Sequence, residues 1–320
     1  MKARKIVLSS LSSLFLLTTF ATTTYAYVVI GNKADVREFN FNIENTTGLL
    51  LSLDGNNFSQ DISSDMLAKA IAPNGNYDEL KFTGVTVDSN NSKVLFNDNN
   101  EIKFVKDSVS NNKHEFESAV KNIDYISFDL YFKIVNSNEK NDYNLFITNN
   151  SYIKGKLESV KLSNSISTID KEYHSGDTIN VNTANAMRTV VSLIDNDSIN
   201  TNYYEITDND DLGSSAIEGI IDDKHNPNKN AMYTYYNNCF PLYPFTKAAK
   251  DNESFNTKNS FEAEPLKSFI YDNTKKDYNI IHSKIYIYLE GWDSDYFLGL
   301  PESCNNLDIK LQFEVKEKNI

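Results

Sequence analysis

The feature that most constrains the fold is a strict alternation of apolar and polar residues in four segments of the chain. The segments are FNFNIE (39–44), FDLYFKI (128–134), KIYIYLE (284–290) and LDIKLQFEV (307–315). Successive side chains of a β-strand point to opposite faces, so alternation of this length indicates strands with one buried face. Because half-buried strands are typical of antiparallel sheets, the chain is predicted to be mainly β.

Turn-forming residues separate these segments from weaker strand candidates. Asn, Asp and Gly dominate the connections DGNN (54–57), NGN (74–76) and SNNS (89–92), and these residues favour tight turns. The weaker candidates are 49–53, 79–87, 93–96, 101–105, 144–148, 157–162, 178–181, 189–194 and 216–221. Many short strands at such spacing predict an antiparallel, jelly-roll-like β-sandwich.

One or two short helices are expected beside the strands. Ser63 or Ser64 can cap a helix that ends before Pro73. Its apolar stripe, which we expect to pack on the sheet, is Met66, Leu67, Ala70 and Ile71. A second short helix is predicted at 115–122.

Residues 195–283 are predicted to form a loop-rich insertion before the last two strands. The region is rich in Asn, Asp, Lys and Tyr and shows little alternation. Long loops in a folded domain are often functional. With no repeat or linker in view, residues 27–320 are expected to form a single β-sandwich domain.

The first 26 residues have the pattern of a secretory signal peptide. Basic residues within positions 2–5 precede an uncharged apolar stretch at 6–21, and TYA (24–26) supplies small residues for cleavage. The stretch is shorter than the roughly 20 residues that span a bilayer. We therefore expect cleavage before Tyr27 and a secreted or cell-surface protein without stable membrane insertion.

The acidic composition limits the partners of the chain. It has 31 Lys and Arg against 44 Asp and Glu, a formal net charge of −13. Loss of three basic residues with the signal peptide moves this to about −16. Phosphate backbones and anionic lipids repel such a chain, which argues against nucleic-acid binding and electrostatic docking on membranes.

Cys239 and Cys304 are the two cysteines of the chain. In an exported protein a pair suggests one disulfide, whereas in a reducing environment both would be buried thiols. The sequence leaves these two states open.

Familiar catalytic motifs are absent. His114 begins an HE pair, but Ser118 occupies the position four residues on, so the zinc-protease motif is incomplete. The chain also lacks the G-x-S-x-G nucleophile elbow, the P-loop and the G-x-G-x-x-G pattern. A non-enzymatic role is therefore predicted. The enzymatic alternative is a secreted hydrolase that uses acid pairs or a bound cation.

The loops offer two ligand hypotheses, calcium and glycans. Calcium prefers several oxygen ligands, and the clustered carboxylates are Asp208, Asp210, Asp211, Asp293 and Asp295. Their spacing matches no EF-hand, and a solvated acidic surface is the simpler interpretation. Aromatic faces can stack on sugars, and the candidates for glycan contact are Trp292, Tyr233 and Tyr243. Most aromatic residues are expected to pack in the core or against loops, with Tyr286 and Tyr288 on the outer face of a sheet.

Three parts of the chain resemble the TasA/camelysin group of exported bacterial surface proteins. TTTYAYVVIGNKADVREFNFNIEN (22–45) is similar to the cleavage region and first strand of that group, although Val28 and Val29 replace its usual Phe. YISFDLYFKI (125–134) resembles a central strand. YLEGWDSD (288–295) with LDIKLQFEV (307–315) resembles an ending found in secreted proteins of low-GC bacteria. The segment 195–283 departs from the compact family pattern.

This resemblance implies a jelly-roll protein of the cell surface or extracellular matrix, matured by a dedicated signal peptidase. Members of the group form fibres when the freed N-terminal strand of one subunit completes the sheet of the next, which is β-augmentation. The corresponding residues here are Tyr27, Val28, Val29 and Ile30. The resulting hypothesis is a biofilm-type structural protein that self-associates or binds other surface proteins. The alternative is a glycan-binding adhesin that uses Trp292 and the tyrosine-rich loops.

Overall fold

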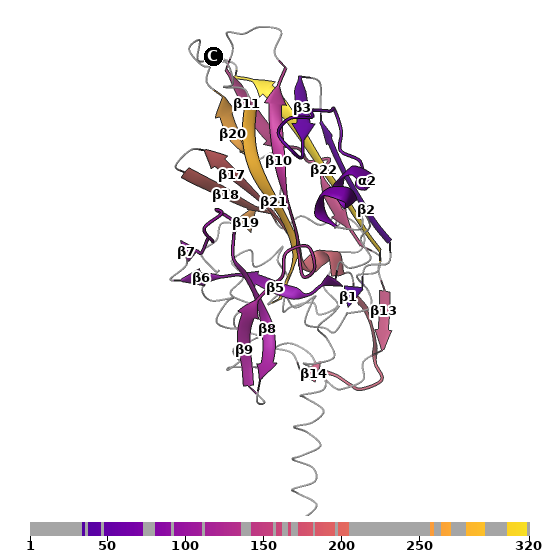
Figure 1. Ribbon diagram of the computed structural model, residues 1–320. Coiled ribbons are helices and arrows are strands. Elements are labelled where there is room, and N and C mark those ends of the chain that lie inside the picture. The colour runs from indigo at the N-terminus through magenta and orange to yellow at the C-terminus, as the bar shows by residue number, and fades with distance from the viewer. Residues whose placement is uncertain are drawn as a thin grey trace, which may run out of the picture.

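The computed structural model places most of the described residues in two β-sheets (Figure 1). The described ranges are 34–35, 38–45, 48–72, 81–90, 93–110, 113–135, 142–155, 158–161, 166–167, 172–181, 183–195, 198–204, 257–258, 264–269, 280–291 and 306–318. The protein is mainly β and has the character of a β-sandwich. This confirms the fold class that the alternation predicts.

The larger sheet has nine strands arranged around β21. Its strands are β3 (Leu49–Ser52), β5 (Gly84–Val87), β8 (Phe104–Ser110), β9 (Lys113–Ser118), β10 (Ile126–Ile134), β17 (Met187–Asp195), β18 (Ser198–Tyr204), β19 (Thr257–Lys258) and β21 (Ile280–Glu290). β17 runs along one edge of β21 in antiparallel register. β10 pairs with the other edge as far as Ile287, and β5 continues along that edge from Leu289. β21 is therefore the central strand of this sheet.

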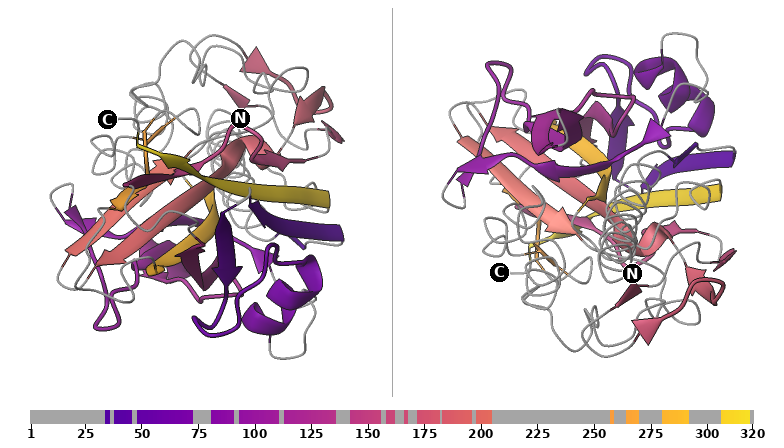
Figure 2. Two further views of the ribbon diagram at one scale, coloured as in Figure 1. Left: turned by 90° about the horizontal axis from the view of Figure 1, so that it is seen from above. Right: turned by 90° about the horizontal axis from the view of Figure 1, so that it is seen from below.

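The smaller sheet has five strands arranged around β22. Its strands are β2 (Glu38–Asn45), β11 (Tyr143–Ile147), β12 (Tyr152–Lys154), β20 (Lys267–Phe269) and β22 (Asn306–Glu317). β11 and β12 share one edge of β22, and β2 runs along the other (Figure 2, indigo β2 beside yellow β22). The pairing of β2 with β22 is parallel, as are those of β5 with β21 and β18 with β19. The other described pairings in the two sheets are antiparallel.

Short two-stranded pairings complete the described strands. They are β1 (Ala34–Asp35) with β4 (Lys81–Phe82), β6 (Ser89–Asn90) with β7 (Lys93–Val94), β13 (Glu158–Lys161) with β16 (Thr178–Val181), and β14 (Ile166–Ser167) with β15 (Glu172–Tyr173). A 3-10 turn, η1 (Thr183–Ala186), leads directly into β17.

The main core includes buried apolar residues from all four alternating segments, such as Ile43, Leu130, Ile285 and Leu311. Phe132 of β10 and Phe313 of β22 meet with ring centroids 4.8 Å apart in an edge-on arrangement. Both side chains are fully buried, as is Ile287 of β21. Residues from both sheets thus share one hydrophobic core, and this burial is the main driving force for holding the sheets together.

The helix α2 (Ser64–Ile71) forms where the sequence predicts it. The Ser63 side chain accepts a hydrogen bond from the Met66 amide at 3.4 Å, which is N-terminal capping. Leu67 and Ile71 are buried as expected, but Ala68 is buried in place of the predicted Met66 and Ala70. The helix packs on β2 and β10 and extends the core.

The predicted second helix at 115–122 was wrong. Residues 113–118 form β9, which pairs antiparallel with β8 over its whole length. The segment after it forms a turn in which Val120 accepts hydrogen bonds from the amides of Ile123 and Asp124. Cross-strand pairing with β8 has overridden the local helical spacing of Phe116, Ala119 and Val120.

Tyr286 and Tyr288 lie on the outer face of β21, but that face is covered as well. Both are buried in a second apolar cluster with Val85, Phe104 and Val190. The Tyr286 hydroxyl accepts a hydrogen bond from the Ile102 amide at 3.1 Å. The segment that contains β5 and β8 joins the larger sheet at the end of β21 and also packs over the outer face of that strand, where it forms an extra layer.

The predicted loop-rich insertion at 195–283 includes some described strands. β18 pairs with β17 over seven residues, and β20 pairs with β11. Residues 205–256 lie outside the described part of the chain. In the part that is described, no helix is long and apolar enough to cross a membrane.

Candidate functional site

The residues that the sequence singles out for function lie outside the described part of the chain. They are Tyr27, Val28, Val29, Ile30, Asp208, Asp210, Asp211, Tyr233, Cys239, Tyr243, Trp292, Asp293, Asp295 and Cys304. The strand-exchange, calcium, glycan and disulfide hypotheses therefore stay predictions. Within the described ranges, no group of three His, Cys, Asp or Glu side chains is placed to hold a metal ion.

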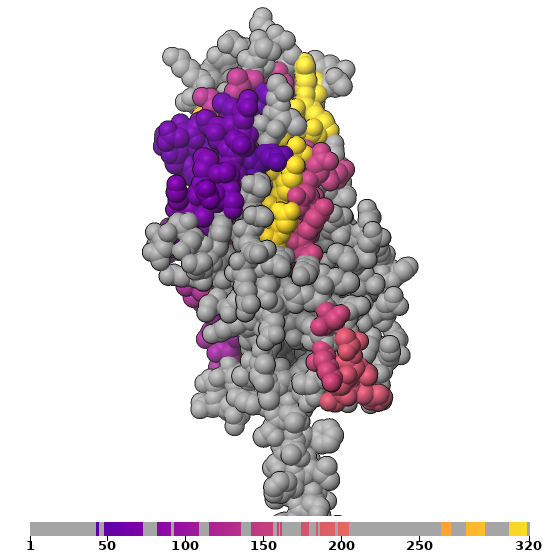
Figure 3. Space-filling view, turned by 90° about the vertical axis from the view of Figure 1, so that its right-hand side faces the viewer, coloured from indigo at the N-terminus to yellow at the C-terminus, as the bar shows by residue number. Residues whose placement is uncertain are grey.

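The first long strand, β2, lies at an edge of the smaller sheet. It pairs with β22 on one side over eight residues. On the other side, the described residues give it a single bridge, in which Ile43 and Ile62 exchange backbone hydrogen bonds of 3.1 and 2.9 Å. Figure 3 shows β22 (yellow) at the surface between the indigo segment that contains α2 and the magenta strands. β2 thus lies at the edge of the smaller sheet, beside β22.

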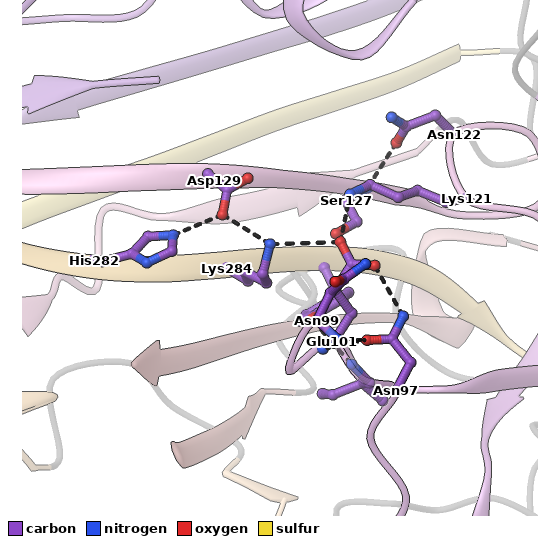
Figure 4. A network of polar contacts seen from close by, with 11 residues as sticks. Asn97, Asn99, Glu101, Lys121, Asn122, Ser127, Asp129, His282 and Lys284 are labelled. Atoms are coloured by element: carbon purple, nitrogen blue, oxygen red, sulfur yellow. Dashed lines mark hydrogen bonds and ion pairs between the residues drawn. The ribbon is translucent and has the colours of Figure 1, made fainter. Parts of the chain in front are cut away.

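A network of charged side chains lies on the outer face of the larger sheet (Figure 4). We call Glu101, Lys121, Asp129, His282 and Lys284 the outer-face network. Asp129 on β10 and Lys284 on β21 are cross-strand partners. The Asp129 Oδ1 atom lies 2.9 Å from Lys284 Nζ and 2.6 Å from His282 Nε2. One carboxylate therefore receives two donors from the neighbouring strand.

Tyr131 stacks on the imidazole of His282. The ring centroids are 4.4 Å apart and the planes differ by 6°. Gly55 lies against the Tyr131 ring, because a Cβ atom at Gly55 would come within 3.2 Å of its Cε1 atom. The two rings thus pack face to face across the strands, and this contact holds the imidazole beside Asp129.

Glu101 connects the sheet to the layer that covers it. Its Oε1 atom lies 2.7 Å from Lys121 Nζ and 3.4 Å from Lys284 Nζ, and its Oε2 accepts from Asn97 Nδ2 at 3.1 Å. Opposite charges alternate along the network from Asp129 through Lys284 and Glu101 to Lys121. The network therefore ties the segment 97–121 to the central strands.

The ionised forms of the network are mutually stabilised. The His282 hydrogen bond, with further help from Lys284, lowers the pKa of Asp129 from 3.8 to about 2, although burial opposes this. Burial also disfavours the charged forms of Glu101 and Lys284. Hydrogen bonds and charges outweigh it, so the pKa of Glu101 is lowered and that of Lys284 is raised. These directions are those of ion pairs that remain charged at neutral pH.

A second group of polar contacts, which we call the Asp124 clasp, fixes the turn after β9. Asp124 is buried, and its carboxylate accepts hydrogen bonds from the Thr83 hydroxyl at 2.8 Å and the Val120 amide at 2.7 Å. Lys106 Nζ lies 2.9 Å from Asp124 Oδ2 and 3.7 Å from Glu117 Oε1. The clasp joins β8, β9 and the turn into one unit.

The contacts of these groups join strands of the larger sheet to one another and to the turn after β9. Sequence reasoning did not identify the network, although one signal was available. Asp129 and Lys284 occupy polar positions of two alternating segments, and opposite charges on the outward faces of two strands can meet across a sheet.

No family model, curated protein or solved structure is similar to this chain at a significant level.

Proposed function

We propose that this protein is a secreted structural protein of the cell surface or extracellular matrix, of the TasA/camelysin kind. It polymerises when the N-terminal strand released by signal cleavage, Tyr27–Ile30, pairs with the sheet of a second copy. The YVVI segment that follows the cleavage site has no charge in a strongly acidic chain. Backbone hydrogen bonds would supply affinity, and alternating side chains would set the register.

The observation that carries this proposal is the position of the first described strand pairings, which begin at Ala34. The first described pairing joins Ala34 to Phe82, and β2 follows at a sheet edge. Residues 27–32 precede every described strand pairing. If they pair with another molecule, no described pairing of their own subunit has to break, as strand exchange requires.

Electron microscopy of the mature chain, residues 27–320, at rising concentration tests the proposal. We expect ordered filaments from this chain and monodisperse particles from a variant that lacks 27–32. The thermal unfolding midpoints of the two chains should agree, because the deletion removes no described strand pairing. Filaments from the shortened chain at the wild-type concentration would exclude the N-terminal strand as the polymerising element.

A further inference from the structure

The hairpin of β8 and β9 ends the larger sheet with an edge. β9 is the last strand in the sheet order, and within the described residues it pairs with β8 and no second strand. In Figure 1 the hairpin extends below β5, away from the upper part of β10 and β21. Residues 115–118 of β9 are all exposed. A strand of six residues with one described neighbour is long enough to template pairing with another strand.

Exposed apolar side chains gather at this strand and its turn. Among the described residues, five large hydrophobic side chains are exposed, and three of these are Phe116 at 36%, Val120 at 47% and Ile123 at 42%. Single exposed apolar residues are normal on protein surfaces. Three exposed apolar side chains within eight positions, on and after an edge strand, indicate a docking surface.

This surface is held in place before any partner binds. The Asp124 clasp fixes the turn that carries Val120 and Ile123, and Lys106 links β8 to both Asp124 and Glu117. Lys121, in the same turn, pairs with Glu101 of the outer-face network. A partner strand would therefore meet a preorganised edge and would lose little free energy in ordering it.

The charges on β9 select the kind of strand that can pair with it. Glu115 and Glu117 are exposed, so an acidic strand would be repelled. Of the eight described strands with six or more residues, seven carry at least one acid, as β22 does at Asp308, Glu314 and Glu317. The segment YVVIGNK (27–33) carries no acid, and it brings Lys33 and, after cleavage, a terminal ammonium group. Its seven residues are one more than the six of β9, so it is long enough to pair along the whole strand.

We propose that the β9 edge, with Phe116, Val120 and Ile123, is the acceptor for the Tyr27–Ile30 strand of a second copy. This inference rests on the proposed function, because it names where the exchanged strand binds. The donor extends the nine-stranded sheet past β9, its apolar side chains cover the exposed patch, and its cationic groups lie near Glu115 and Glu117.

Photo-crosslinking within fibres tests this assignment directly. Tyr27 of the mature chain is replaced by p-benzoylphenylalanine, and the chain is mixed with isotopically labelled protein before polymerisation and irradiation. We expect mass spectrometry to find crosslinks between differently labelled copies at residues 113–123. Crosslinks from position 27 to another sheet edge, such as β2, would overturn the acceptor assignment. A contact between the β9 strands of two copies, without the donor strand, would overturn it as well. Absence of fibres would instead overturn the proposed function.

Paired lysine variants provide a second test. Phe116→Lys with Val120→Lys removes apolar surface and repels the cationic donor, so we expect the critical concentration for polymerisation to rise about tenfold or more. Met66→Lys changes an equally exposed side chain on α2 and should leave it within about twofold. Equal effects of the two changes would contradict the proposal, and unfolding midpoints would show that each variant is folded.

Discussion

At the scale of single residues, Asp124 is the charge on which the extra layer most depends. Its side chain is 4% exposed and accepts hydrogen bonds from β8, from Thr83 and from the turn. Asp124→Ala leaves Lys106 and two other donors without their acceptor. Because removing one member of a buried pair is strongly destabilising, we expect the free energy of unfolding to fall by about 3 kcal/mol.

Glu117 provides the matched control for that change. It contacts the same Lys106 ammonium at 3.7 Å, but its side chain is 51% exposed. Exposed ion pairs contribute little, so Glu117→Ala should change the free energy of unfolding by less than about 0.5 kcal/mol. Urea denaturation measures both variants. Equal losses would show that Asp124 acts as an ordinary surface ion pair.

Asp129 gives the protein a defined response to acid. Its pKa in the folded state, about 2, lies below the ordinary 3.8. A lowered carboxyl pKa stabilises the fold above the ordinary value, and this stabilisation is lost as the pH falls through about 2. Since the side chain is 35% exposed, screening reduces the contribution to about 1 kcal/mol. Asp129→Asn should therefore be less stable than wild type at pH 7 by about that amount.

The gap between wild type and Asp129→Asn should then close as the pH falls from 4 to 2. Denaturation curves across this range check the expectation, with the exposed Asp61→Asn as the control that shows no such gap. A constant difference between wild type and Asp129→Asn at all pH values would mean that the charge of Asp129 is not the stabilising feature.

At the scale of elements, sequence alternation predicts strands well where a strand has one polar face. The segments 39–44, 128–134, 284–290 and 307–315 all lie within observed strands. β18 was not predicted, because SINTNYY has no alternation and owes its structure to β17. β9 was predicted as a helix because the spacing of its apolar residues is compatible with a helix or a strand. Pairing with β8 is what makes this segment a strand. Elements that depend on a distant partner cannot be found from local pattern alone.

The candidate site was less predictable than the strands. Alternation correctly places Asp129 and Lys284 on polar faces, but it does not give the register that sets them opposite each other. The Glu101 contact needs a further step, the folding of the layer that covers β21. The parallel pairing of β2 with β22 joins the two ends of the chain, and short-range sequence contains no information about such a pairing.

At the scale of the whole molecule, β21 and β9 represent the two extremes of burial. β21 has neighbours along both edges, and both of its faces are covered, by the main core and by the Tyr286 cluster. β9 has one described neighbour and four consecutive exposed residues. Opening β21 requires the sheet to come apart, whereas the edge of β9 that faces away from β8 has no described strand partner and faces solvent at residues 115–118.

Hydrogen exchange of the monomeric protein should show this difference. We expect the amides of 283–289 to exchange only by global unfolding and those of 115–118 to exchange at least about 100-fold faster. Strand β10 supplies an internal comparison, since it is paired on both sides over part of its length and should behave like β21. Slow exchange at 115–118 in the monomer would mean that the β9 edge is already occupied. It could not then be the open acceptor that assembly requires.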